Sequence, residues 1–164
     1  MKRITGIFII LLLATSTQLH ARDYINLRQN RTYLTLGSCG FVNAANVFYE
    51  RQLAFLKHSE FNLKIGVGYL DVLNFVGDFH GATATVGFGF VRGYAYNYFE
   101  FNFGATVFCD INEYIYEGRS FLGSTNLTPS LYLGYRYKKP YNPIFWRVGA
   151  GWPEQISAGF GVGF

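Results

Sequence analysis

The sequence lacks a long apolar run beyond its first 21 residues, and this argues against membrane-spanning helices. No later stretch approaches the about 18 apolar residues with which a helix crosses a bilayer. Charged residues make up only 15% of the chain, and it has no basic run of the kind that binds nucleic acid. The three His and two Cys are scattered without the spacing of metal ligands. We therefore expect no metal, no cofactor and no nucleic-acid partner.

The first 21 residues have the order of a secretory signal peptide. Lys2 and Arg3 form a basic start, an apolar stretch follows over 4–14, and Leu19-His20-Ala21 is a candidate cleavage site. The apolar stretch is too short for a membrane anchor, which is the alternative interpretation. Loss of 1–21 would lower the formal charge from +4 to +2.

Aromatic residues, glycine and strict alternation are abundant in the rest of the chain. Over 61–69, every second residue is apolar or aromatic, and the residues between them are polar or glycine. Side chains of a strand point alternately to its two faces, so this pattern predicts a strand with one apolar face. Seven further segments alternate in the same way, at 32–39, 46–53, 82–90, 98–108, 128–138, 144–151 and 156–164.

These eight segments predict an all-β fold, an eight-stranded antiparallel transmembrane β-barrel of meander topology over 31–164. A strand with one lipid-like face needs backbone partners on both edges, and a closed barrel supplies them. Glycine recurs on the polar face, where the narrow interior of so small a barrel needs room. A soluble sandwich or lipocalin-like barrel is the alternative, but the aromatic face is too bulky for a shared core.

The even number of strands places both termini on one side, which we take as the periplasmic side, with 22–30 as a periplasmic lead. The longest connection, 109–126, then faces outward as a polar loop with aromatic residues that could form a contact surface. Tyrosine and tryptophan gather near the predicted strand ends, where amphipathic rings favour the membrane interface.

Five charged residues fall on the inward face at similar heights: Glu50, Lys64, Glu100, Arg136 and Arg147. Isolated charges there would be strongly destabilised by desolvation. We therefore predict that they pair across the interior, with Tyr132 above them, and form a plug.

The mature chain resembles the small eight-stranded outer-membrane barrels of the OmpA/OmpX type. The resemblance rests on the closing segment 158–164, in which Phe160, Val162 and Phe164 are similar to the terminal signal read by the barrel-assembly machinery of Gram-negative bacteria. Tyr135-Arg136-Tyr137 and 145–149 are similar to a group of small, uncharacterised barrels. The resemblance implies a monomer in the outer membrane, in contact with its lipid, including lipopolysaccharide.

The sequence favours a non-catalytic role, structural or in surface interaction through the outer loops. Some barrels of this size act on lipid A as an acyltransferase or a deacylase, so a lipid A-modifying enzyme is the alternative, and a narrow channel is a third. His80 could join Asp71, Asp78, Ser120 or Ser124 in a catalytic set. The motif expected of the deacylases is absent, because Gly81-Ala82 follows His80. We therefore expect no catalytic residues.

Cys39 and Cys109 fall at the outward ends of the first and fifth predicted strands. A disulfide could form between them in the oxidising envelope, or they could remain two free thiols, because opposite strands hold them apart. The residues before Cys39 imitate a lipoprotein cleavage box, but the apolar stretch that should precede one is missing.

Overall fold

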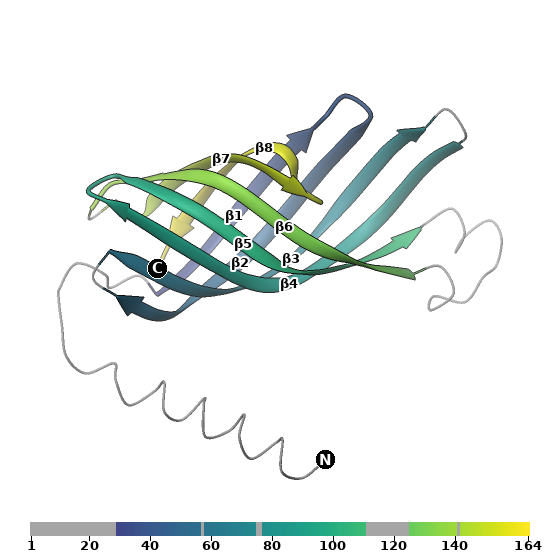
Figure 1. The fold of residues 1–164 in the computed structure, drawn as a ribbon. Coiled ribbons are helices and arrows are strands. Elements are labelled where there is room, and N and C mark those ends of the chain that lie inside the picture. Colours follow the sequence, from purple (N-terminus) through teal and green to yellow (C-terminus); the bar gives the residue numbers. More distant parts are fainter. Residues whose placement is uncertain (1–28, 57, 75–76, 111–124, 141) are drawn as a thin grey trace, which may run out of the picture.

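The chain folds into a closed barrel of eight strands, each antiparallel to its neighbours (Figure 1). This computed structural model describes residues 29–56, 58–74, 77–110, 125–140 and 142–164. The strands are β1 (Asn30–Ser38), β2 (Val42–Leu56), β3 (Ser59–Asn74), β4 (Gly77–Tyr94), β5 (Asn97–Asp110), β6 (Thr125–Lys138), β7 (Ile144–Trp152) and β8 (Gln155–Gly163). Each strand follows its predecessor around the wall, which confirms the predicted all-β meander.

Pairing of β1 with β8 closes the barrel. At the seam, the backbone N–H of Phe164 donates to the carbonyl of Asn30 at 2.8 Å, and the N–H of Asn30 donates back at 3.1 Å. The start of β1 and the last residue therefore lie at the same end, which we call the terminal end. The opposite end, where β1 finishes, is the loop end.

Several strands are longer than the alternation predicted. β4 runs over Gly77–Tyr94 rather than 82–90, and β3 reaches Asn74, so most of the residues that separate the predicted segments, over 70–80 and 91–97, lie in strands. The prediction ended each strand where the apolar alternation ended. Backbone hydrogen bonds do not need apolar side chains, and the ladder continues beyond them at both ends. β1 likewise starts at Asn30, one residue before the predicted barrel boundary.

Inside and outside follow the predicted alternation. Along β1, Arg31, Tyr33 and Thr35 are buried while Leu34 and Leu36 are exposed. At several inward glycines, neighbouring atoms leave no space for a side chain. A Cβ atom on Gly66, for example, would lie 2.1 Å from the Phe48 ring.

The rim at the loop end is uneven (Figure 1). β1, β7 and β8 have nine residues each, whereas β4 has 18. β6 pairs with β7 only from Leu131 onward, so its first residues bond to β5 alone among the described strands. The turn between β7 and β8 therefore forms a low point in the rim.

An apolar cluster of Ala44, Leu70 and Phe108 is buried in the interior near the loop end. β2 runs from the loop end to the terminal end, and Glu50 follows Ala44 on it. Glu50 therefore lies on the terminal side of this cluster. Within the described chain, no helix is long and apolar enough to cross a membrane.

Candidate functional site: the charged interior

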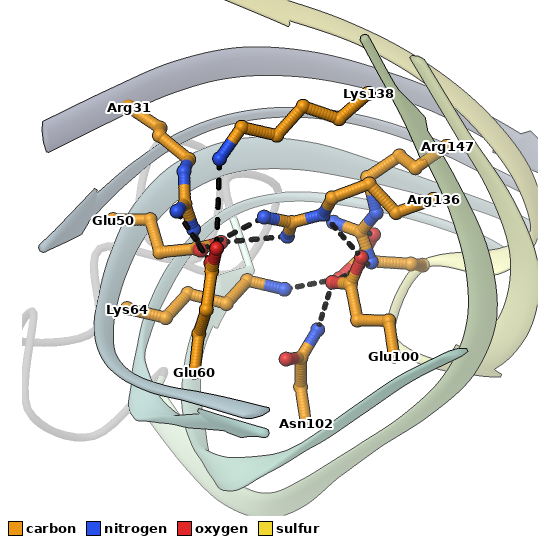
Figure 2. A network of polar contacts seen from close by, with 10 residues as sticks. Arg31, Glu50, Glu60, Lys64, Glu100, Asn102, Arg136, Lys138 and Arg147 are labelled. Atoms are coloured by element: carbon orange, nitrogen blue, oxygen red, sulfur yellow. Dashed lines mark hydrogen bonds and ion pairs between the residues drawn. The ribbon is translucent and has the colours of Figure 1, made fainter. Parts of the chain in front are cut away.

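Nine charged side chains of the described residues meet inside the barrel (Figure 2). Eight come from inward positions of the strands, and the ninth comes from the turn between β7 and β8. Lys138, at the terminal end, is 15% exposed, and each of the others is at most 4% exposed. The nine are Arg31, Glu50, Glu60, Lys64, Glu100, Arg136, Lys138, Arg147 and Glu154.

Glu50 is held by two arginines from different walls. Arg136 of β6 donates to both of its carboxylate oxygens, at 2.9 Å from Nη1 and 2.8 Å from Nη2. Arg31 of the neighbouring strand β1 donates from Nη1 to Oε1 at 2.8 Å. The planar guanidinium matches the two oxygens of a carboxylate, so this bidentate pair joins β6 to β2 across the interior.

Glu100 continues the network from β5. Arg136 donates from Nε to Glu100 at 2.9 Å, so a single guanidinium links Glu50 to Glu100. Arg147 of β7 forms an ion pair with Glu100 at 3.1 Å, and Asn102 donates to the same oxygen at 2.7 Å. This central part of the network therefore connects four strands of the wall.

Glu60 forms the edge of the network toward the terminal end. Arg31 donates to one of its oxygens, and Lys138 donates to the other at 3.5 Å. Because Lys138 is the most exposed member, the network reaches solvent at this end of the barrel.

Glu154 forms the opposite edge, toward the loop end. Lys64 of β3 donates to it at 2.5 Å, and Arg147 lies 3.3 Å from its other oxygen. Glu154 is 2% exposed, although it lies in a hairpin turn, and the neighbouring Pro153 is buried as well. The turn is thus folded into the mouth of the barrel.

Aromatic rings complete the packing around the cations. The Nζ of Lys64 lies 3.8 Å from the centre of the Phe48 ring, and the guanidinium of Arg147 lies 3.9 Å from the centre of the Tyr132 ring. The negative faces of aromatic rings attract cations, most strongly away from water. Arg136 lies 4.9 Å from the Phe145 ring in the same way.

The network nearly balances its own charge, with five cations and four carboxylates. Burial of an unpaired ion costs several kcal/mol even after relaxation, so each member depends on its partners. All four carboxylates already contact cations, and this leaves none as a free acid or base. The arrangement therefore fills the interior with fixed, mutually neutralising side chains.

The structure brings together all five charged residues named from the sequence. Glu50, Lys64, Glu100, Arg136 and Arg147 are each at most 3% exposed and lie in a single network. Tyr132 lies against Arg147.

The sequence analysis missed four members of the network. Arg31, Glu60 and Lys138 lie on the same inward parity as their strands, just outside or at the edge of the predicted segments. Extending 32–39 and 61–69 by one residue at their starts would have found Arg31 and Glu60, and Lys138 is the last inward residue of 128–138. Glu154 carries no such signal, because the side-chain direction in a turn does not follow strand alternation.

The two cysteines are free in the structure, and the disulfide considered from the sequence is not formed. Cys39 follows β1 and Cys109 lies on β5, and these strands are on opposite sides of the eight-stranded wall. A disulfide requires Cα atoms within about 7 Å, which opposite walls do not allow.

The three residues of the predicted assembly signal lie on the outside. Phe160, Val162 and Phe164 are 56%, 41% and 60% exposed, so their side chains are available on the outer face of the closing strand.

His80 and Asp71 form a pair on the outer face near the loop end. They are opposite each other on β4 and β3, with His80 Nδ1 2.5 Å from Asp71 Oδ1. Ser120 and Ser124 lie outside the described residues, as does the side chain of Asp78. Among the described residues, no three His, Cys, Asp or Glu side chains are grouped as metal ligands.

No protein-family model and no curated protein matches the chain. Among solved structures, it is similar to one described as "De novo design of transmembrane beta-barrels". The two chains share 14% identity with a TM-score of 0.43, over 85% of this chain and 98% of the other. The resemblance to OmpA and OmpX stays a prediction from the sequence.

Proposed function

We propose that the protein is a small transmembrane barrel of a Gram-negative outer membrane, with a filled interior and both termini in the periplasm. The observation that carries this proposal is the apolar band on its outer surface. On β4, the outward residues Ala82, Ala84, Val86 and Phe88 are exposed and apolar. The nearest outward residues with ionisable side chains are His80 and Arg92, at the two edges of this band.

The width of the band fits a membrane. Residues 81–91 separate His80 from Arg92, and a tilted strand of about 9–11 residues crosses the hydrocarbon core. Neighbouring strands continue the band, with Ile65 and Val67 on β3 and Phe103 on β5 at 43–63% exposure. So large a continuous apolar surface would be unstable in water.

An aromatic group on the outer surface marks the terminal edge of this band. Trp146 stacks on Tyr137 with ring centres 5.4 Å apart, and Tyr135 lies 5.7 Å from Trp146. Tyr96 adjoins Tyr137. Such rings favour the boundary between lipid and water, so they support a membrane interface at this end.

The proposed role is structural or in surface interaction through the loop end, as a monomer in contact with lipopolysaccharide. The paired charges fill the interior, which supports this role over a channel. The exposed Phe164 on the closing strand supports recognition by the barrel-assembly machinery during insertion.

A lipid-modifying enzyme is the second candidate, favoured by the pair of His80 and Asp71. A carboxylate that orients an imidazole is the part of a catalytic triad that activates a nucleophile. The test is mass spectrometry of lipid A from cells that express the wild type or His80→Ala. A change in acylation that depends on His80 would support the enzyme, and identical spectra with and without the protein would exclude this activity.

The two tryptophans test the membrane position directly. Trp146 and Trp152 are the only tryptophans of the chain, and both are partly exposed on the outer surface. In vesicles with brominated lipids, the single-tryptophan variants Trp152→Phe and Trp146→Phe should each show quenched fluorescence, most strongly with bromine near the headgroups. Fluorescence that brominated lipid leaves unchanged in both variants would overturn the proposal.

A further inference from the structure

The turn between β7 and β8 occupies the interior in an unusual way for a hairpin turn. Hairpin turns ordinarily lie on the surface, where water satisfies their polar groups. Here Pro153 and Glu154 are both buried, at a low point of the rim. Gly37 provides the space, because a Cβ atom there would lie 1.8 Å from the carbonyl oxygen of Glu154.

Besides the ladder of β7 with β8, two groups of contacts hold this turn. At the exposed rim, Trp152 donates from Nε1 to Thr128 at 3.1 Å, and its carbonyl accepts from Ser130 at 3.1 Å. Inside, and among the residues that the structure describes, the carboxylate of Glu154 alone joins the turn to charged groups, through Lys64 and Arg147. The rim contacts are solvent-exposed, whereas loss of one partner from a buried ion pair is strongly destabilising, so Glu154 is the side chain whose loss should release the turn.

Several buried polar groups near Glu154 lack a hydrogen-bond partner in the described part of the chain. Arg147 forms an ion pair with Glu154, but no guanidinium nitrogen of Arg147 has an aligned hydrogen-bond acceptor. The hydroxyls of Tyr132 and Ser157 are buried without a hydrogen-bond partner in the described structure.

These hydroxyls lie beside the turn. A Cβ atom on Gly149 would lie 2.6 Å from the Tyr132 hydroxyl, and Gly149 is paired with Ser157. Ser157 is in turn paired with Gly37. Two cations therefore contact the carboxylate that a short turn carries into the barrel, and two buried hydroxyls lie on the strands beside it.

We propose that the β7–β8 turn is a lid and that Glu154 is a built-in occupant of an anion-binding site formed by Lys64, Arg147, Tyr132 and Ser157. When the lid opens, the network keeps five cations against three carboxylates in place. The excess positive charge then attracts a small carboxylate or another oxyanion from the loop end. This inference goes beyond the proposed structural role and is independent of the membrane in which the barrel sits.

Access to Ser157 tests the lid in detergent micelles. Ser157→Cys is introduced with Cys39→Ser and Cys109→Ser, so that the buried position carries the only thiol. Negatively charged and positively charged methanethiosulfonate reagents are then compared. We expect slow labelling behind Glu154, and at least tenfold faster labelling after Glu154→Gln, with the negatively charged reagent faster than the positively charged one.

Glu60→Gln is the matched control, because it removes the same charge from the opposite edge of the network. With Glu60→Gln, the introduced thiol should be labelled as slowly as in the protein that keeps both Glu60 and Glu154. If Glu154→Gln does not fold, Glu154→Asp retains the charge on a shorter side chain and should give intermediate labelling. Equal labelling with and without the Glu154 substitution would overturn the lid.

Acetate tests the anion site. In Glu154→Ala, sodium acetate should raise the unfolding temperature relative to sodium chloride of the same ionic strength, whereas the wild type should not respond. Faster labelling by the positively charged reagent, or an equal response of Glu154→Ala to the two salts, would overturn the anion site. Because these measurements use micelles, their outcome is separate from that of the quenching test in vesicles.

Discussion

Gly37 and Glu154 are packed so closely that a Cβ atom on Gly37 would lie 1.8 Å from the carbonyl oxygen of Glu154. The same added Cβ atom on Gly37 would lie 3.0 Å from the Cβ of Ser157. A glycine on the first strand therefore determines whether the last turn of the barrel can enter the interior.

Gly37→Ala should push the turn out of the barrel mouth. The contact is with backbone, which cannot move aside as a flexible side chain can, and overpacking costs about 1–3 kcal/mol. We expect a lower urea midpoint in micelles, with Thr32→Ala on the exposed face of β1 as the control. An unchanged midpoint would show that the turn adapts without loss of its buried contacts.

Glu100→Gln should destabilise the barrel, because it leaves the buried Arg136 and Arg147 with too few carboxylates. Loss of one partner from a buried ion pair costs about 3–5 kcal/mol. Equilibrium unfolding in urea measures this loss. The double variant Glu100→Gln/Arg147→Met should lose less than the sum of the single variants, because it removes both members of one pair. A wild-type midpoint for Glu100→Gln would instead indicate a hydrated interior in which charges do not depend on pairing.

Phe160→Asp should impair membrane insertion. Phe160 is 56% exposed on the outer face, opposite Trp146 of β7, and a charged side chain on the lipid-facing surface is destabilising. We expect degradation or periplasmic accumulation, assayed by fractionation and by heat-modifiable migration, while Phe160→Leu inserts normally.

Deletion of Phe164 should have a similar effect, because Phe164 exchanges two backbone hydrogen bonds with Asn30 at the closing seam. Normal insertion of this truncated chain would contradict a role for the terminal residue in assembly.

The wild-type barrel should show no steady conductance in a planar bilayer. Arg136 extends between Glu50 and Glu100, and the aromatic rings of Tyr33, Phe48 and Phe145 pack together at this level. Removal of two long side chains in Glu50→Ala/Arg136→Ala should admit small ions. Steady single-channel currents from the wild type would mean that the interior is an open pore.

Oxidation should leave Cys39 and Cys109 unlinked within one chain. Their strands lie on opposite sides of the barrel, so no intramolecular bond can form without unfolding. The folded protein should migrate identically with and without reductant after treatment with a mild oxidant, with an unfolded sample as the control. A reducible shift of the folded monomer would contradict this arrangement.

The alternation of apolar and polar residues along the sequence was sufficient to predict the barrel architecture. Alternation along 61–69 and its counterparts placed Leu34, Ile65 and Phe103 outside and Glu50 and Lys64 inside, and the structure has each of them there. Several strand ends were wrong, because the ladder of β4, for example, continues past Ala82 to Gly77 and past Phe90 to Tyr94. Hydrogen bonding between backbones sets where a strand ends, and side-chain pattern does not report it.

The sequence by itself determined the number of strands, their order and the face on which each side chain lies, because all of these follow from period-2 alternation along a meander. Only the tertiary structure decided which charges meet. Barrel closure brings Arg136 of β6 to Glu50 of β2, and it brings Lys64 of β3 to Glu154 in a turn 90 residues away. Strand register and tilt set these encounters, and both arise when eight strands close into one wall.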